Sequence, residues 1–256
     1  MTKPTLYTAR DIEDGLTVEY DLAVKALQEG DIREEHGLMR WGSNYTFLVT
    51  VCYEDTEFLA VYKPRMGERP LWDFPDGTLC QREAAAWVIS EALGWSLVPP
   101  TILRDGTRGI GSMQVFINHD PQRHYFNFDE QHLDGLMQVA ALDAIINNAD
   151  RKGGHCLLDE TDRIWCIDHG LSFHTMNKLR TVIWDFAGED IPDTILSDIE
   201  KLCLALDNPD NQWHQALAPL LKASEYKMLC RRLTRLMDDK TYPLPGSGPN
   251  RPWPAV

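Results

Sequence analysis

The sequence predicts an α+β protein with two lobes, a small antiparallel β-meander with one helix and a mainly helical half with one embedded hairpin. Three observations support this class. Runs of β-branched and aromatic residues are concentrated between 38 and 63, apolar residues recur at helical spacing from 131 onward, and a single hairpin signal at 156–168 interrupts the helical half. The 256 residues suffice for a buried core in each lobe.

The elements of the first half follow from its breaks. Residues 20–35 predict a polar helix. A meander follows, because the turn signals at 42–44 and 54–57 separate three β-type runs. A loop rich in proline and glycine then leads into an alanine-rich helix. The predicted strands are 38–41, 45–53, 58–63, 101–104 and 110–117, and the predicted second helix is 79–94.

The second half is predicted to be helical apart from its hairpin. Its helices are expected at 131–147, 193–206 and 212–238, and its hairpin strands at 156–159 and 164–168. The proline-rich tail has too few apolar residues to pack alone, so it is predicted to be mobile or to lie on the surface. The domains expected are an N-terminal lobe at 1–117, a C-terminal lobe at 118–242 and the tail at 243–256.

Composition narrows the class of partner. The net charge is -14, and no long basic stretch offsets it. Nucleic acid and anionic membrane surfaces are therefore disfavoured as partners, whereas a small phosphate-bearing ligand needs only a few local cations. No apolar run approaches the ~20 residues that a membrane span needs, and polar sequence follows Met1. The sequence predicts a cytoplasmic protein with no membrane span.

Chemically active side chains gather at the two ends of the predicted hairpin. Antiparallel strands joined by a short turn bring their outer ends together, so His155 and Asp168 should lie side by side, with Asp150 at the same edge. Two carboxylates and an imidazole could hold a divalent cation and position one carboxylate as a base. Each acid alone could equally be structural, because aspartate and asparagine favour turns. Their joint placement favours chemistry.

These residues resemble a known family. Asp150-Arg151, followed three residues later by a polar side chain at 155, resembles the D-R-x-x-x-N loop of the phosphatidylinositol 3-/4-kinase family, which shares its fold with protein kinases and HipA-type kinases. Asp168-His169-Gly170 is similar to the metal-binding Asp-x-Gly of that family. The resemblance also implies a lysine at the end of the third meander strand and a glutamate in the next helix. Lys63 and Glu83 occupy these places, so it spans residues 38–185.

The resemblance implies a role for each of these residues. Lys63 would neutralise the α- and β-phosphates of a nucleotide, and Glu83 would hold Lys63 as an ion pair. Asp150 would orient or deprotonate the accepting hydroxyl, while Asp168 would bridge Mg²⁺ to the phosphates. Arg151 would support the loop or meet phosphate. Taken singly, Lys63 and Glu83 would be ordinary surface residues.

Two further segments receive roles from the resemblance. One is the turn between the first two meander strands, whose backbone N–H groups could approach the phosphates, although alone it reads as a plain hairpin turn. The other is the inter-lobe hinge, whose backbone groups would bond adenine, and which alone reads as an apolar edge strand. The residues concerned are Gly42, Ser43 and Asn44 in the turn and Gln114, Val115 and Phe116 in the hinge.

The sequence departs from the family in two respects. His155 stands where the family has asparagine, and imidazole favours softer metals, so Mn²⁺ becomes an alternative to Mg²⁺. Its neighbours His169 and His174 are expected at the surface or as supports. After Asp168, only Lys178 and Arg180 are available to bind a phosphoinositide headgroup, which disfavours a lipid substrate.

The leading functional hypothesis is an ATP- and metal-dependent kinase. It would transfer the γ-phosphate to a hydroxyl of a protein or a soluble small molecule, with ATP and Mg²⁺ or Mn²⁺ as cofactors and an unknown acceptor. Three alternatives stay open. A nucleotide-binding pseudokinase fits His155, a kinase-like adenylyltransferase could use the same residues, and a metal-dependent phosphohydrolase would leave Lys63 and Glu83 without a role.

Overall fold

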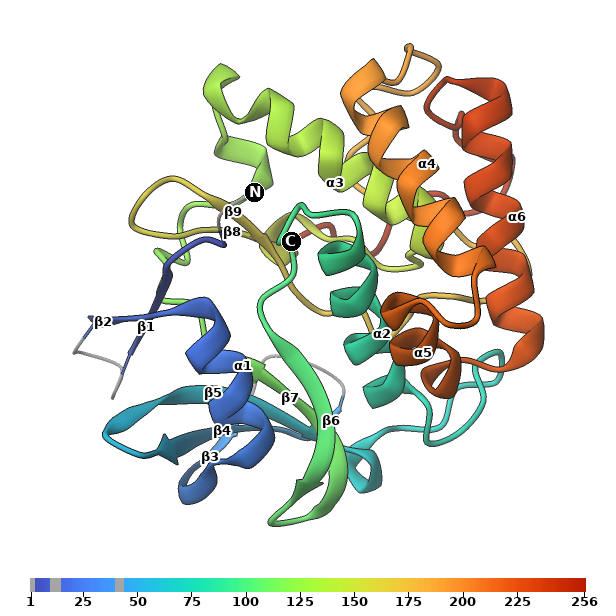
Figure 1. Ribbon diagram of the computed structural model, residues 1–256. Coiled ribbons are helices and arrows are strands. Elements are labelled where there is room, and N and C mark those ends of the chain that lie inside the picture. The colour runs from blue at the N-terminus through green and yellow to red at the C-terminus, as the bar shows by residue number, and fades with distance from the viewer. Residues whose placement is uncertain (1–2, 10–14, 40–43) are drawn as a thin grey trace.

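The computed structural model describes residues 3–9, 15–39 and 44–256, and they form a two-lobed α+β protein (Figure 1). The largest sheet has five antiparallel strands in the order β3-β4-β5-β7-β6, and a two-stranded hairpin, β8-β9, lies within the helical half. The predicted fold class is confirmed. The domain boundaries at 117/118 and 242/243 stay predictions.

The N-terminal lobe combines the five-stranded sheet with one helix and a small hairpin. Strands β3, β4 and β5 are consecutive in the chain and adjacent in the sheet, so they form the predicted meander. Asp31–Met39 is a strand and not the end of the predicted helix 20–35, because it pairs along β4 from Asp31 to Met39. The bounds are β1 Leu6–Ala9, β2 Gly15–Val18, α1 Tyr20–Glu29, β3 Asp31–Met39, β4 Thr46–Tyr53, β5 Thr56–Pro64, β6 Thr101–Gly106 and β7 Gly109–Val115.

The two faces of the large sheet differ in what covers them. Side chains alternate along a strand. Phe58, Ala60 and Tyr62 of β5 therefore share one face, where they belong to the same buried cluster as residues of α1. Lys63 and its register partner Ser112 of β7 point to the other face, toward the helical half. The alternation of β5 thus directs Lys63 toward the space between the lobes.

Helix α2 (Leu79–Ala92) lies between the sheet and the helices of the C-terminal lobe (Figure 1). Its first amides are capped from outside the helix: Glu68 accepts hydrogen bonds from the N–H groups of Leu79 and Cys80 at 3.1 and 2.9 Å. A carboxylate in this position satisfies free amides and complements the helix dipole. Glu83 is therefore carried on a helix whose start is fixed by the preceding loop.

The C-terminal lobe is mainly helical. Predicted helix 212–238 is interrupted around Pro219, where a short 3₁₀ turn separates α5 from α6. The 150–155 loop connects α3 to β8, and Asp168 follows β9 by two residues. The bounds are α3 Leu133–Ile146, β8 Cys156–Leu158, β9 Ile164–Cys166, α4 Asp193–Asp207, α5 Gln212–Leu217 and α6 Ala223–Asp239, with 3₁₀ turns at Arg65–Gly67, Tyr125–Asn127, Glu130–His132, Gly153–His155 and Ala218–Leu220.

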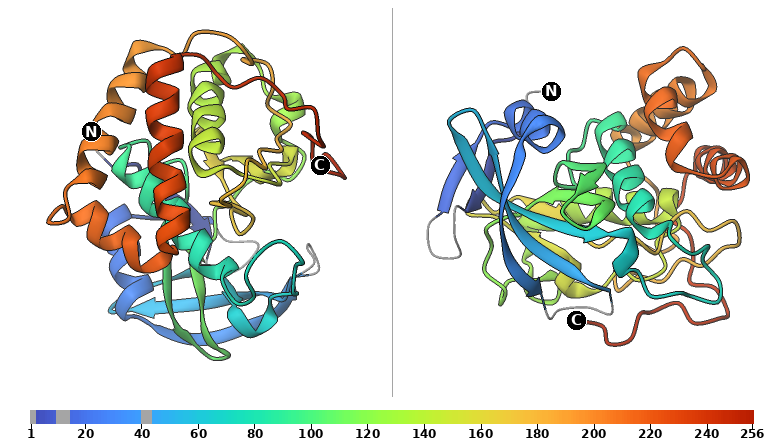
Figure 2. Two further views of the ribbon diagram at one scale, coloured as in Figure 1. Left: turned by 90° about the vertical axis from the view of Figure 1, so that its right-hand side faces the viewer. Right: turned by 90° about the horizontal axis from the view of Figure 1, so that it is seen from below.

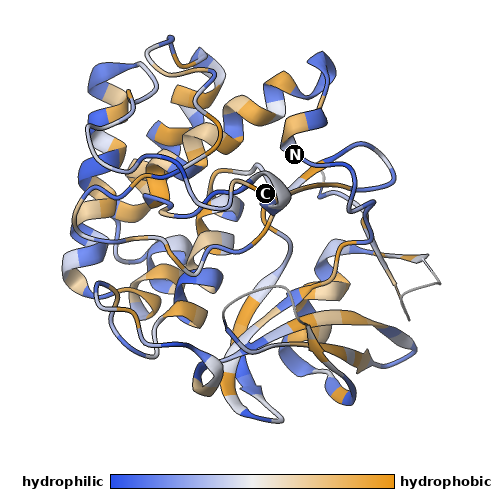
Figure 3. Cartoon of the chain, turned by 180° about the vertical axis from the view of Figure 1, so that it is seen from behind, coloured by the Kyte–Doolittle hydropathy of each residue, from blue (hydrophilic) through white to orange (hydrophobic). Residues whose placement is uncertain are grey.

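The buried apolar residues form two large clusters. One lies between the five-stranded sheet, α1 and the small N-terminal hairpin, and the other joins α2, α3, α4 and α6. In both halves, hydrophobic and hydrophilic residues are interspersed along the helices and strands (Figure 3). Helix α2 contributes Ala85 and Ile89 to the second cluster, so its packing follows the C-terminal lobe although it comes before β6 in sequence.

The β1–β2 hairpin, which was not predicted, contacts both lobes. Leu6 is fully buried and shares its cluster with Leu157 and Trp165 of the β8–β9 hairpin as well as with residues of the large sheet. The N–H of Asn118, just after β7, donates to the carbonyl of Tyr7 at 2.9 Å. The hairpin therefore packs along the segment after β7 that joins the two lobes.

The tail runs along the outside of the C-terminal lobe (Figure 2). Of the two alternatives predicted for residues 243–256, the structure shows the surface-bound one, since Pro252 is buried and several main-chain carbonyls accept hydrogen bonds. In the part of the chain that the structure describes, no helix is long and apolar enough to cross a membrane.

Candidate functional site

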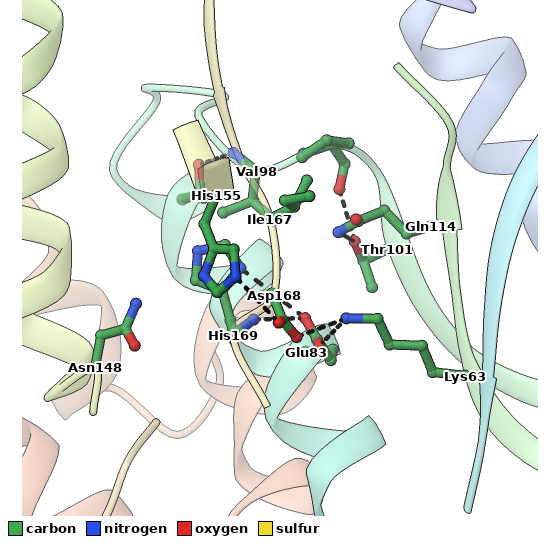
Figure 4. Close-up of polar contacts among 12 residues, drawn as sticks. Lys63, Glu83, Val98, Thr101, Gln114, Asn148, His155, Ile167, Asp168 and His169 are labelled. Atoms are coloured by element: carbon green, nitrogen blue, oxygen red, sulfur yellow. Dashed lines mark hydrogen bonds and ion pairs between the residues drawn. The ribbon is translucent and has the colours of Figure 1, made fainter. Parts of the chain in front are cut away.

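The centre of the site is Lys63, which contacts two carboxylates from distant parts of the chain (Figure 4). Its Nζ lies 2.5 Å from Glu83 Oε1 and 3.0 Å from Asp168 Oδ1. Glu83 is also held by the N–H of His169, which donates to Oε2 at 2.8 Å. The site therefore joins β5, α2 and the segment after β9. The sequence predicted all three positions.

The electrostatics of these three groups favour a charged cluster. Burial acts to lower the pKa of Lys63, but the charges of Asp168 and Glu83 raise it above its ordinary value. The charge of Lys63 holds the pKa of Asp168 well below its usual range. Glu83 is 4% exposed, and burial raises its pKa. One cation thus serves two carboxylates, and Asp168, with 51% side-chain exposure, faces the open side.

Asp168 has an unusual backbone conformation. Its φ of 61° is in the left-handed region, which non-glycine residues adopt at a cost. The conformation turns the carboxylate back toward Lys63 and His155. Strained residues of this kind are concentrated at functional sites, where the surrounding contacts hold them in place.

His155 lies on the other side of Asp168, with Nε2 3.4 Å from Oδ2. The N–H of Lys152 donates to Nδ1 at 3.5 Å, so in the neutral ring Nε2 carries the proton and faces the carboxylate. Burial lowers the pKa of His155 to about 4, so the ring is neutral at pH 7. The predicted pairing of His155 and Asp168 at the hairpin ends is present in the structure.

Asp150 lies at the start of the same loop and is suited to accept a proton. Its N–H donates to Asn148 Oδ1 at 3.0 Å, and this hydrogen bond holds the backbone of Asp150 in place. Burial raises the pKa of Asp150, and the nearby Asp168 charge adds to this, while Lys152 opposes it. A carboxylate with a raised pKa is a better base than an exposed one. Lys152, to which the sequence analysis gave no role, places Nζ 3.4 Å from Asp150 Oδ2.

Arg151 supports the loop from inside the protein. It is fully buried and pairs with Asp143 of α3, with Nη2 to Oδ1 at 2.9 Å and Nε to Oδ2 at 3.0 Å. Its Nη1 donates to the carbonyls of His155 and Ile167 at 3.3 and 3.1 Å. These contacts are those of loop support, and its burial argues against the predicted alternative in which Arg151 meets phosphate.

Asp143 was missed by the sequence analysis, although a signal was present. It is a single carboxylate within the apolar helix segment "VAALDAII", and a buried charge needs a partner. The guanidinium of Arg151 is that partner, and Asp143 Oδ1 also accepts from Asn148 Nδ2 at 3.0 Å. Asp143 therefore helps to set the positions of Asn148 and Arg151, which precede and follow Asp150 in the chain.

The two remaining histidines have different environments. His169 is fully buried, and its Nε2 lies 2.8 Å from Arg151 Nη2, so it accepts from the guanidinium and is a support as predicted. Burial lowers its pKa well below the ordinary value. His174 packs the edge of its ring against Phe74, with ring centroids 5.3 Å apart.

In the predicted hinge, two backbone N–H groups already donate hydrogen bonds within the protein. The N–H of Val115 donates to Pro100 and that of Phe116 to Leu59, each at 3.0 Å. The Gln114 side chain donates to Thr101 Oγ1 at 2.7 Å (Figure 4). The amides of Val115 and Phe116 are therefore already bonded within the protein, and the expectation that backbone groups near Gln114 to Phe116 bond adenine stays a prediction. The following amide, that of Ile117, makes no hydrogen bond within the described residues.

The predicted phosphate-side turn is described only in part. Gly42 and Ser43 lie outside the described residues. Asn44 is described, and its Oδ1 accepts from the N–H of Arg69 at 2.8 Å. Asn44 thus connects the start of β4 to the loop that follows β5.

That loop, residues 64–78, packs against the segments next to Asp150 and Asp168. Phe74 and Leu71 form a small apolar cluster with Ala149, the residue before Asp150, and with Leu171. Lys178 Nζ lies 2.7 Å from Asp73 Oδ2, which ties the loop to the segment after Asp168. The loop therefore contacts both segments that carry the candidate carboxylates.

The side chains present fit a nucleotide-bound metal better than a metal held by protein alone. Within residues 3–9, 15–39 and 44–256, no three His, Cys, Asp or Glu side chains form a cluster that could hold an ion. Mg²⁺ in nucleotide sites commonly takes one or two carboxylates and completes its shell with phosphate oxygens and waters. Asp168 is exposed enough for this, whereas His155 could coordinate through Nε2 only after its proton moves to Nδ1.

Comparison with known proteins identifies a family. No protein-family model matches the chain. It is 38% identical to Protein Rv2133c of Mycobacterium tuberculosis over an alignment of 283 positions, which covers 97% of each protein. The chain belongs to the family of Rv2133c.

Solved structures share the fold. One is hydra Fam20 with sugar, at a TM-score of 0.52 and 15% identity over 88% of this chain and 90% of that one. Another is the Helicobacter pylori proinflammatory kinase CtkA, at a TM-score of 0.51 and 14% identity over 84% and 94%. These likenesses show that this chain has a kinase-like fold. Membership of the phosphatidylinositol 3-/4-kinase family stays a prediction.

Proposed function

We propose that the chain is an ATP- and metal-dependent phosphotransferase that delivers the γ-phosphate to a hydroxyl group. The observation that carries this proposal is Lys63, whose Nζ contacts Glu83 of α2 and Asp168 after β9. A buried glutamate that fixes a lysine beside an exposed aspartate is the arrangement that kinase-like folds use to hold nucleotide phosphates and metal. A structural ion pair would need only one carboxylate.

In this proposal the nucleotide lies between the large sheet and the β8–β9 hairpin. Lys63 faces the α- and β-phosphates, and Glu83 keeps its ammonium in place. The amide of Ile117 replaces those of Val115 and Phe116 as the donor to adenine, since the latter two already donate within the protein. Asn44 and the predicted turn residues Gly42 and Ser43 would lie over the phosphates.

Transfer needs a base and a cation at opposite ends of the phosphoryl group. Asp150 would orient the acceptor hydroxyl and take its proton, and its raised pKa suits that role. Asp168, with His155 beside it, would hold the metal, which when bound neutralises charge on the phosphates. Lys152, next to Asp150, could offset charge that develops on the transferred group.

The acceptor is proposed to be a protein hydroxyl or a soluble small molecule. The net charge of -14 opposes approach to anionic lipid. The hydra Fam20 structure contains a sugar, so a sugar hydroxyl is one acceptor to test on this chain.

The deciding experiment is a transfer assay with ATP labelled at the γ-phosphate, in Mg²⁺ or Mn²⁺, with candidate acceptors. Wild type is compared with Asp150→Asn and Asp168→Asn, which keep side-chain size. Transfer that both substitutions reduce by about a hundredfold or more supports the proposal. Label retained in either variant at wild-type rate would contradict it. In a parallel assay with ATP labelled at the α-phosphate, label on the acceptor would instead indicate adenylyl transfer.

A pseudokinase is a second candidate, favoured by the contact between His155 and Asp168. The Nε2–H that faces Oδ2 competes with a metal for the same carboxylate. This candidate predicts ATP binding without Mg²⁺ and no transfer with any acceptor. His155→Asn separates the two candidates, because it would create activity in a pseudokinase and only change metal preference in a kinase.

A further inference from the structure

The tail contacts the 150–155 loop at the point where that loop is least constrained by its own side chains. The N–H of Gly153 donates to the carbonyl of Ala255 at 2.7 Å. Gly154 lies beside Val256, since a Cβ on Gly154 would be 3.9 Å from its Cγ1. Two consecutive glycines lose more backbone freedom on ordering than other residues do, so external contacts matter more here.

The same tail also holds the segment that pairs with this loop. Arg151 exchanges backbone hydrogen bonds with the neighbouring segment, donating to Arg180 and accepting from Val182, each at 3.0 Å. On the outer side of that segment, the N–H of Thr181 donates to the carbonyl of Asn250 at 3.1 Å. The tail therefore spans both segments, and Figure 2 shows it passing along them.

Main-chain carbonyls of the tail provide these contacts. Besides Thr181, the indole Nε1 of Trp184 donates to the Asn250 carbonyl at 3.0 Å, and Arg180 Nε donates to that of Pro249 at 3.2 Å. Pro252 is buried between these two groups of contacts. A proline-rich segment is already extended and loses little entropy on docking, so it suits such a role.

The tail meets the loop from outside the candidate site. In the part of the chain that the structure describes, its hydrogen bonds to the rest of the protein go to Gly153 and to the segment 180–184, and none goes to Lys63, Asp150 or Asp168. Phe126 lies on the same glycine, where a Cβ on Gly153 would come within 2.8 Å of its ring. Gly153 is thus held between Phe126 and the tail, while the side chains of Asp150 and His155 stay on the side of the loop that faces the site.

We infer that residues 249–255 act as a strap that positions the 150–155 loop for phosphoryl transfer. This inference rests on the proposed function. The strap touches no reacting group, so its residues are positioning residues. They act through Gly153 on the orientation of Asp150 and His155, and they leave the contacts of Lys63 with the nucleotide unchanged.

The test compares the full chain with a variant that ends at Gly248. We expect kcat to fall by about tenfold or more, with the KM for ATP changed less than about threefold, because the loss concerns the acceptor side. A peptide of residues 243–256, added at about 1 mM, should restore activity, and a scrambled peptide should not. Leu244→Ser is the matched control, since Leu244 is in the same tail and 72% exposed.

Amide hydrogen exchange provides a second readout that does not depend on activity. The amide of Gly153 should exchange about tenfold or more faster in the shortened chain, and at the wild-type rate in Leu244→Ser. If the shortened chain fails to fold, Pro252→Gly in the full chain replaces it, with the same expectations. Unchanged exchange and unchanged kcat, or a kcat that rises, would overturn the strap. If no form transfers phosphate, the proposed function fails and exchange alone decides the strap.

Discussion

At the scale of single residues, the site depends on Lys63 being held by a buried glutamate. Glu83 is 4% exposed and receives both Lys63 Nζ and the N–H of His169. Its two oxygens therefore fix the lysine and the backbone next to Asp168 together. Removing its charge should disturb phosphate binding and the Asp168 segment at once.

Glu83→Gln should lower kcat/KM for phosphoryl transfer by about tenfold to a hundredfold, because a buried, hydrogen-bonded charge pair loses one partner. Steady-state kinetics with labelled ATP measure it. Glu91→Gln is the matched control, since Glu91 is also buried in α2 but bonds Tyr20 and Lys3. Equal losses in the two variants would mean that Glu83 acts only through stability.

The buried pair of Arg151 and Asp143 yields a prediction about folding. Arg151→Met should lower the free energy of unfolding by about 3–5 kcal/mol, because Asp143 would stay buried without its partner. Urea unfolding measures this. The double variant with Asp143→Leu should be less destabilised than the sum of the two single variants. Additive losses would show that the two residues are independent.

How far the site could be predicted depends on which residues are local to a motif. The pairing of His155 with Asp168 follows from the two ends of one hairpin, whereas Lys63 and Glu83 were placed at the site by the family resemblance. The hinge amides could not be judged, because their occupation by Pro100 and Leu59 arises from sheet order and not from residue type. Asp143 required recognising one charge in an apolar helix.

At the scale of elements, the 64–78 loop is attached both to the segment after Asp168 and to the start of α2. Asp73 binds Lys178 on the side of Asp168, and Glu68 caps α2 on the side of Glu83. The loop is therefore a structural link between the helix that carries Glu83 and the segment after Asp168. Its ion pair can be followed by titration.

Burial acts to raise the pKa of Asp73, but the hydrogen bond and charge of Lys178 lower it below its ordinary value. A lowered carboxyl pKa gives stability that is present above the unfolded pKa, about 4, and lost as pH falls through the folded value. Asp73→Asn should thus cost about 1 kcal/mol at pH 7 and progressively less below pH 4. Thermal unfolding against pH tests this, and a pH-independent difference would contradict it.

The elements were predicted well except where an edge strand looks like a helix. Residues 31–35 read DIREE, whose charges favour a helix in isolation. They form the start of β3 because β4 offers a paired partner, and charged residues are common on an edge strand that must stay soluble. The β1–β2 hairpin was missed since four-residue strands carry too little alternation to be recognised.

At the scale of the whole molecule, the N-terminal hairpin packs against both lobes, so we expect the two lobes to unfold together. Leu6 is fully buried among residues of both the large sheet and the β8–β9 hairpin. Leu6→Ala should therefore lower the free energy of unfolding by about 2–5 kcal/mol. Calorimetry should show one shifted transition. Two separate transitions in the wild type would mean that the lobes fold independently.

The hydrogen bond from Asn118 to Tyr7 has a consequence for timing. A two-lobed protein usually lets its ligand in by bending at the connecting segment, and that motion takes microseconds to milliseconds. Here the connecting segment is braced by a strand from the beginning of the chain. Entry and exit of a nucleotide would then require the contact between Asn118 and Tyr7 to open. Release of the product nucleotide, and not the chemical step, would therefore limit the rate of turnover.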